Sequence, residues 1–253
     1  MRLSGPAFRR DGLENWHFGR WVAGAAVLLG IVDLATVWLL AGFVSVAAAG
    51  AWRAVIALMG PTHLLLKTMD TTLTPLAARV AQAEGPAGLR HFLWKIAFLT
   101  APAMLGWCLL VSAFPAALLA FFYGRDYSAY AWLLPVGALS YALSYSNKVV
   151  TIGLVSRRLS KPIFRSQLLQ TLFFLTFGIG ATYFFGMEGA AAAIVGASLV
   201  QSLELWRAYL RDPGEAAPRD QAALRGDAGQ NRAEIALGGP RAPERSLSEA
   251  VKP

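Results

Sequence analysis

Long apolar stretches separated by short polar segments dominate the chain as far as residue 206. At 1.5 Å per residue, about 20 helical residues cross a hydrocarbon layer about 30 Å thick. Six stretches approach or exceed this length and cover residues 21–43, 47–78, 96–123, 130–155, 163–185 and 189–206. None alternates over about ten residues as an outer-membrane strand does, so the pattern predicts helices, which satisfy their own backbone hydrogen bonds in lipid. We expect an all-α, polytopic membrane protein with six transmembrane helices.

The composition agrees with this pattern. Of the 253 residues, 56% are hydrophobic and 15% are charged, whereas a soluble domain has about 25% charged residues. The single cysteine, Cys108, lies inside the third stretch and excludes an intrachain disulfide. Residues 207–253 differ from the rest, because they are rich in Pro, Gly, Ala and alternating charge without apolar periodicity. That composition is typical of a disordered tail.

Basic residues concentrate in alternate connections. They lie before the first stretch, between the second and third, and between the fourth and fifth, whereas the other connections hold only Arg125. By the positive-inside rule, both termini are predicted to be cytoplasmic, with outside connections near residues 44–48, 124–129 and 186–188. We divide the chain into a cytoplasmic juxtamembrane segment (1–20), a six-helix lobe (21–206) and a cytoplasmic tail (207–253).

The net charge of +8 belongs mostly to the cytoplasmic edge of this arrangement. Such a surface favours membrane lipids with anionic headgroups. No folded soluble domain is left to carry a nucleic-acid interface, so we expect no nucleic-acid partner.

Ionisable residues inside the apolar stretches are the candidates for function, because a charge at bilayer depth costs at least about 2.5 kcal/mol. They are Asp33, Arg53, His63, Lys67, Asp70 and Lys148. On a straight helix, Arg53 and Lys67 share one sector of the second stretch. The fourth stretch places Gly137, Ser140, Tyr141, Ser144, Lys148 and Thr151 on one face. Two such polar stripes facing each other, or facing a partner, would line a hydrated cationic cavity.

Structural interpretations of these residues stay open beside the functional one. Arg53 and Lys148 are near enough to helix ends to extend to the membrane interface. Lys67 and Asp70 stand at i, i+3 and are able to neutralise each other. Asp33 would be satisfied by a bond to a neighbouring helix.

His63 and two prolines mark the middle of the second stretch. His63 is either a packing residue or a proton relay. Pro61 and Pro75 remove backbone donors, which predicts kinks. In a carrier a kink lets a helix bend between inward-open and outward-open forms, and a static kink tolerated by packing is the alternative.

Enzyme signatures are missing from the sequence. It contains no H-E-x-x-H, no Cys/His metal spacing, no phosphate-binding glycine loop and no G-x-S-x-G in the connections. We expect no enzyme activity, no catalytic residue, no metal site and no cofactor.

Several short motifs, taken in order, resemble the second half of polysaccharide flippases. They are NWHFGRW before the first stretch, then GFVSVAAAGAWRAVIALMGP, TLTPLAAR, FFYGRDYSAYAWLLPV and FFGMEGAAAAIVGASLV. Together they cover about residues 16–206. The family is the multidrug/oligosaccharidyl-lipid/polysaccharide exporter superfamily, and the resemblance is to its Wzx-type, oligosaccharidyl-lipid members.

The resemblance implies a carrier of two six-helix lobes that moves a lipid-linked sugar across the bacterial inner membrane by alternating access. Its cargo would be an undecaprenyl-pyrophosphate oligosaccharide for polysaccharide biosynthesis, met by Arg53, Lys67 and Lys148. Asp33, Asp70 and His63 would pair charges or couple an ion.

The resemblance implies that this chain corresponds to the C-terminal lobe alone, whereas a complete member would have two lobes. A second lobe is therefore expected from a separate chain, a missing N-terminal half or a homodimer. The alternatives are a multidrug or peptidoglycan-precursor exporter of the same superfamily, and a non-transport membrane subunit or gene fragment.

Overall fold

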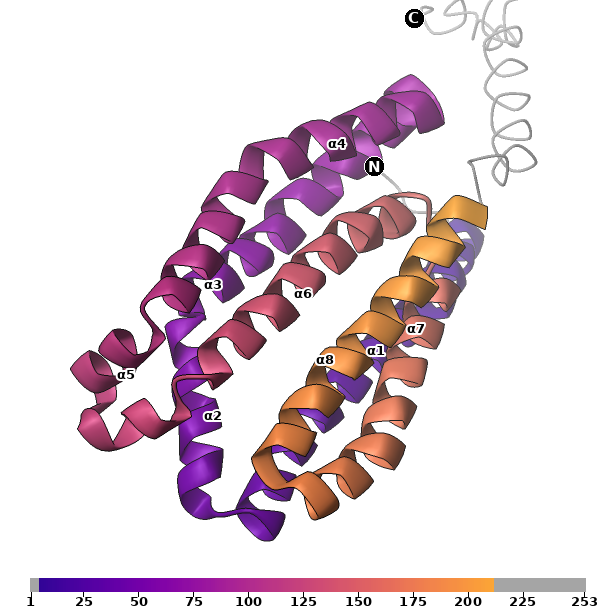
Figure 1. Cartoon of the computed structure of the whole chain (residues 1–253). Helices are drawn as coiled ribbons and strands as arrows, with labels where there is room; N and C mark the ends of the chain where they lie inside the picture. Colours follow the sequence, from indigo (N-terminus) through magenta and orange to yellow (C-terminus); the bar gives the residue numbers. More distant parts are fainter. Residues whose placement is uncertain (1–4, 212–253) are drawn as a thin grey trace, which may run out of the picture. The chain divides into compact units, whose positions relative to one another are not determined.

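The computed structural model describes the backbone of residues 5–211 and the side chains of residue 16 and residues 19–211 (Figure 1). The helices are α1 (Gly5–Phe43), α2 (Val46–Leu58), α3 (Gly60–Thr68), α4 (Thr74–Ala113), α5 (Pro115–Tyr123), α6 (Leu133–Ser156), α7 (Lys161–Phe173) and α8 (Ile179–Arg211). Two π segments, η1 (Met69–Leu73) and η3 (Phe174–Gly178), and a 3-10 segment, η2 (Arg125–Tyr130), lie between them. The described residues contain no strand, which confirms the all-α class.

The helices at the two ends of the described chain run past residues 20 and 206, where the predicted divisions lie. Helix α1 already begins at Gly5, so residues 5–20 continue into the first apolar stretch without a break. Helix α8 runs to Arg211, past the predicted end at residue 206. The rest of the predicted tail lies outside the described residues.

The chain reverses direction inside α4 and inside α8. Gly85 (φ 72°, ψ −164°) and Gly186 (φ 58°, ψ −132°) leave the helical conformation at these points. Glycine adopts these backbone angles because it lacks the Cβ that clashes there in other residues. Figure 1 shows the chain turning back at both places. The second and third apolar stretches, and likewise the fifth and sixth, are therefore separate helical segments.

Three helical ranges are long and apolar enough to cross a membrane, which indicates a membrane protein. They are Gly19–Phe43, Gly60–Ala113 and Lys161–Arg211, and the glycine reversals divide the last two. Helix α2 is a shorter apolar helix. Helix α6 is not among the three, and the polar residues of its segment SYSNK lower its hydropathy.

The second apolar stretch is not one straight helix. Met59 (φ −80°, ψ 5°) separates α2 from α3, whose first turn contains Pro61, and η1 precedes Pro75. The interruptions predicted at the two prolines are thus confirmed. Because the chain breaks at Met59, between Arg53 and Lys67, a straight helix does not relate these two residues.

Helix α6 lies between α4 and α8, and α1 packs against α7 and α8 (Figure 1). The largest group of buried apolar residues has most of its members on α2, α4 and α6 and includes Met59, Met69, Leu89, Met104 and Leu134. Alanine and glycine residues of α8 are buried as well. Small residues let helix backbones approach closely, which is the usual packing in membrane bundles.

The connections gather at two ends of the described chain. At one end, the α1–α2 turn lies beside the reversal in α8, where the Phe43 and Tyr183 rings are 5.9 Å apart. At the other, Trp21 and Phe164 pack with ring centroids 5.0 Å apart, near the α6–α7 turn. The α6–α7 turn carries basic residues, and Arg125 belongs to η2, toward the first end (Figure 1). Which end faces the cytoplasm stays a prediction.

Candidate functional site

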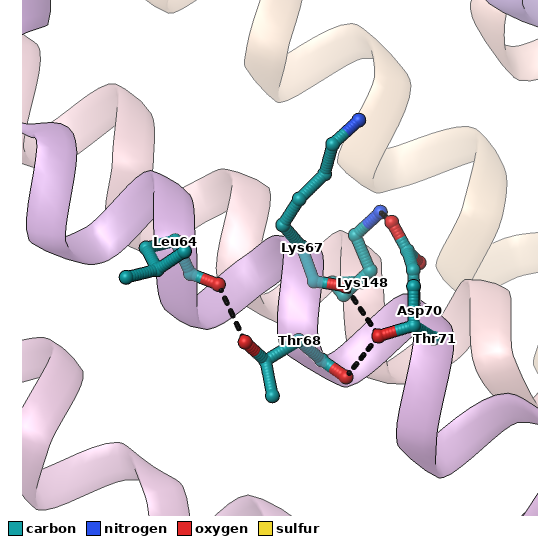
Figure 2. A network of polar contacts seen from close by, with 6 residues as sticks. All are labelled: Leu64, Lys67, Thr68, Asp70, Thr71 and Lys148. Atoms are coloured by element: carbon teal, nitrogen blue, oxygen red, sulfur yellow. Dashed lines mark hydrogen bonds and ion pairs between the residues drawn. The ribbon is translucent and has the colours of Figure 1, made fainter.

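The centre of the candidate site is an ion pair between α6 and η1. The Nζ atom of Lys148 lies 2.7 Å from Oδ2 of Asp70, and the two residues are 78 positions apart in the sequence. Figure 2 shows Lys67 and Lys148 on the same side of η1. The ammonium group of Lys67 ends away from the Asp70 carboxylate. The interpretation that Lys67 neutralises Asp70 is therefore wrong. Among the described residues, no ion pair engages Lys67.

The backbone around Asp70 is unusual. Asp70 belongs to the π segment η1, and Pro75 follows in the first turn of α4. Proline has no N–H to donate to the carbonyl four residues earlier, and π segments are frequent at functional sites. The hydroxyl of Thr71 lies 3.4 Å from the Lys67 carbonyl and 3.2 Å from the Thr68 carbonyl (Figure 2). Threonine hydroxyls bonded in this way often bend a helix.

A second group of charges lies on α1, α2 and α3. Asp33 of α1 is within electrostatic reach of Arg53 on α2 and His63 on α3, although no direct ion pair forms between them in the described structure. The Tyr141 hydroxyl of α6 is also within reach of Asp33. All of these side chains are exposed except Tyr141, which is partly buried.

Five elements thus contribute to the site, namely α1, α2, α3, η1 and α6, and the structure brings its six predicted residues into two groups. Lys148 pairs with Asp70, with Lys67 one turn before it, and Asp33 lies near Arg53 and His63. Three permanent cations face two carboxylates, which leaves an excess of positive charge. Such a set is suited to an anionic oxygen group, because charge-assisted hydrogen bonds to phosphate are among the strongest that side chains make.

Part of the predicted polar stripe of α6 does not face an open space. Gly137 is buried against α2, where an added Cβ would lie 2.6 Å from Cγ1 of Val55. Ser140 is also buried, and its hydroxyl donates to the Val136 carbonyl of its own helix. The accessible part of the stripe therefore runs from Tyr141 to Thr151.

A chain of buried amide side chains connects α6, α7 and α8, and the sequence analysis did not identify it. Asn147 Nδ2 donates to Gln201 Oε1 at 3.1 Å, and Gln201 Nε2 donates to Gln167 Oε1 at 2.8 Å. Gln167 Nε2 then donates to Gln170 Oε1 at 2.8 Å. Asn147, Gln167 and Gln170 are more than nine-tenths buried. A sequence signal existed, since amides in apolar stretches usually bond across helices.

Four consecutive residues of α6, residues 145–148, bind four different places in the bundle. Tyr145 donates to the Ala97 carbonyl of α4 at 2.6 Å, and Ser146 accepts from the Trp206 indole of α8 at 3.1 Å. Asn147 enters the amide chain, and Lys148 pairs with η1. We call these residues the polar turn of α6. The bonds of Tyr145, Ser146 and Asn147 to α4 and α8 hold this part of α6 in place and so position Lys148 against η1.

No protein-family model, curated protein or solved structure matches this chain. Among the described residues, no group of three or more His, Cys, Asp or Glu side chains is arranged to hold a metal ion. The function is therefore inferred from the helices, the charged groups and the sequence motifs.

Proposed function

We propose that this chain is one six-helix lobe of a carrier that moves an undecaprenyl-pyrophosphate oligosaccharide across the bacterial inner membrane. The observation that carries the proposal is the Lys148–Asp70 ion pair, with Lys67 beside it on the same side of apolar helices. Charged side chains on membrane helices usually mark a substrate pathway, because they are costly in lipid without such a role. The order of the sequence motifs supports the same class of carrier.

The cargo fits the charges and the polar groups of the site. The pyrophosphate of a lipid-linked sugar is anionic, and Lys67, Lys148 and Arg53 supply cations for it. Sugar hydroxyls both donate and accept hydrogen bonds, and Tyr141 and Thr71 offer hydroxyl partners. The undecaprenyl chain is apolar and suits the surrounding apolar helix surfaces.

The carrier in this proposal has six transmembrane helices in the lobe, with both termini in the cytoplasm. The six spans are α1, the two segments on either side of Gly85, α6 and the two segments on either side of Gly186. Because each turn reverses the direction, an even number of spans leaves both ends on one side. The break at Met59 and the π segment η1 are the places where the second span would bend during alternating access.

A second lobe is part of the proposal. Asp33, Arg53 and Lys67 are exposed in the described structure, and each charge facing lipid would cost at least about 2.5 kcal/mol. A covering lobe would enclose these side chains in a hydrated cavity instead. The proposed lobe is a separately encoded six-helix chain, and a second copy of this chain is the alternative.

Reconstitution tests the proposal. The full chain is purified, its assembly state is measured, and it is placed in liposomes with and without an upstream-encoded partner lobe. Translocation of a fluorescent undecaprenyl-pyrophosphate sugar is then followed. We expect flipping only with both lobes, and flipping by a monomer of this chain alone would contradict the one-lobe assignment.

Neutral variants test the role of the charges in the same assay. Arg53→Gln and Lys67→Gln are expected to reduce flipping while membrane abundance stays near normal. Lys95→Gln is the matched control, because Lys95 is an exposed lysine of α4 outside the charged groups. Abundance that falls together with flipping would assign Arg53 and Lys67 to folding instead.

A further inference from the structure

The carboxylate of Asp70 occupies the position on Lys148 where a negatively charged ligand group would bind. We propose that Asp70 is an internal stand-in for the ligand phosphate, displaced from Lys148 when a lipid pyrophosphate binds between Lys148 and Lys67. This inference rests on the proposed function and adds how the anion enters the site. It also implies that binding changes the backbone of η1.

The ion pair is accessible to a competing anion. The side chains of Lys148 and Asp70 are 25% and 44% exposed, so the 2.7 Å contact lies at a surface and is not sealed in the core. Exposed ion pairs contribute little to stability, because water and ions compete for both partners. A ligand phosphate can therefore replace the carboxylate without first opening the packed interior.

A phosphate would gain a contact that Asp70 does not make. Lys67 stands one turn before Asp70 and engages in no ion pair among the described residues. Figure 2 shows the two lysines on the same side of η1. A pyrophosphate carries several acceptor oxygens and more charge than one carboxylate, so it is able to bind both ammonium groups where Asp70 binds one.

The backbone of η1 provides for the displacement. A π segment holds one more residue per stretch than an α-helix, and each residue turns a helix by about 100°. Moving this extra residue along the helix would therefore rotate the residues that it passes, Asp70 among them, relative to α6. Met69 is buried in the core, and Pro75 lies in the first turn of α4. Residues outside the stretch that the extra residue passes would keep their register.

A purely structural ion pair and a stand-in predict opposite effects of one substitution. Asp70→Asn keeps the size of the side chain and removes its charge. If the pair only stabilises the fold, binding of an anion stays the same or weakens. If Asp70 competes with the ligand, binding strengthens.

The experiment measures binding to the full chain in nanodiscs of zwitterionic lipid. Farnesyl pyrophosphate is the lipid probe, inorganic pyrophosphate is the free-anion arm, and farnesol is the uncharged arm. We expect Asp70→Asn to bind farnesyl pyrophosphate about fivefold more tightly, which is the size of one exposed ion pair. Lys148→Gln and Lys67→Gln are expected to bind it at least about fivefold more weakly. Asp126→Asn, at an exposed carboxylate of η2, is the matched control and should not change binding.

A measurement on the unsubstituted chain keeps the proposal testable if Asp70→Asn does not fold. Hydrogen exchange of the amides in residues 69–73 should speed up when farnesyl pyrophosphate binds, because the ion pair that holds η1 is released. Exchange that is unchanged or slower on binding would overturn the stand-in. Equal or weaker binding by a folded Asp70→Asn, or no binding of farnesyl pyrophosphate to any variant, would also overturn it.

The outcome is separable from that of the proposed function. If the two-lobe carrier flips the lipid-linked sugar and Asp70→Asn binds no better, the stand-in is wrong and the carrier remains. If Asp70→Asn binds better and the reconstituted carrier flips nothing, the anion site stands and the carrier is wrong. If the variants change the binding of inorganic pyrophosphate as much as that of farnesyl pyrophosphate, the site is assigned to a free anion.

Discussion

The buried amide chain between α6, α7 and α8 contributes to the free energy of unfolding. A variant that leaves some of its amides unpaired should be less stable than a variant that removes the amides together. Gln201 is the central member, because it accepts from Asn147 and donates to Gln167. The substitution Gln201→Leu removes both bonds and leaves the amide groups of its two partners without them. The triple variant, in which Asn147, Gln167 and Gln201 all become leucine, removes these three amides together with their bonds and leaves the Gln170 amide without its partner.

The magnitudes follow from the number of bonds. Side-chain hydrogen bonds between membrane helices are worth about 0.6 kcal/mol on average, so the two bonds of Gln201 amount to about 1.2 kcal/mol. A buried group left unpaired costs about 1–3 kcal/mol. We expect Gln201→Leu to lower the free energy of unfolding by about 1–3 kcal/mol. The triple variant should lose less than the single one, because leucine has a similar volume and leaves few unpaired polar atoms.

Reversible unfolding in mixed micelles, followed by tryptophan fluorescence and circular dichroism, measures both variants. Thr68→Val is the control, since the Thr68 hydroxyl is exposed and bonds only to the Leu64 carbonyl of its own helix. It should change the free energy of unfolding by less than about 0.5 kcal/mol. A triple variant that loses as much as the sum of three single substitutions would refute the reasoning.

Two further predictions concern the turns. Single cysteines in a Cys108→Ala background should react with an impermeant thiol reagent from the periplasm when placed in the predicted outside connections, and labelling of Arg158→Cys from that side would reverse the orientation. The positions are Ser45, Ser128 and Met187. Gly186→Ala should destabilise the chain by about 1–3 kcal/mol in the unfolding assay, because a side chain is strained at φ 58°. Gly180→Ala in the helical part of α8 is its control and should not destabilise, since nothing lies within 4 Å of an added Cβ there.

The helices were largely predictable from the apolar stretches, because a long apolar run has few conformations that satisfy its backbone. The reversals inside α4 and α8 fall between the predicted stretches, at Gly85 and Gly186. The π segments were not predictable in this way. They depend on how Pro75 and the threonine hydroxyls redistribute the backbone hydrogen bonds. The spacing of apolar residues does not indicate that redistribution.

The candidate site was predictable as a set of residues and not as a set of contacts. Spacing of i, i+3 favoured Lys67 as the partner of Asp70, but the π segment and the packing of α6 bring Lys148 there instead. Formal charge does not indicate Asn147 and Gln201, because amides carry none. Their signal in the sequence is a polar side chain within an apolar stretch.

The polar turn of α6 makes this helix intolerant of a change in length. Adding or deleting one residue before Tyr145 would rotate all four of its side chains by about 100° at once. Tyr145, Ser146, Asn147 and Lys148 would then lose their partners on α4, α8 and η1 together. Each neighbouring helix takes part in fewer of these bonds and is therefore freer to shift. Helix α6 is thus the fixed reference of the bundle, and insertions acquired during divergence should accumulate in the turns around it.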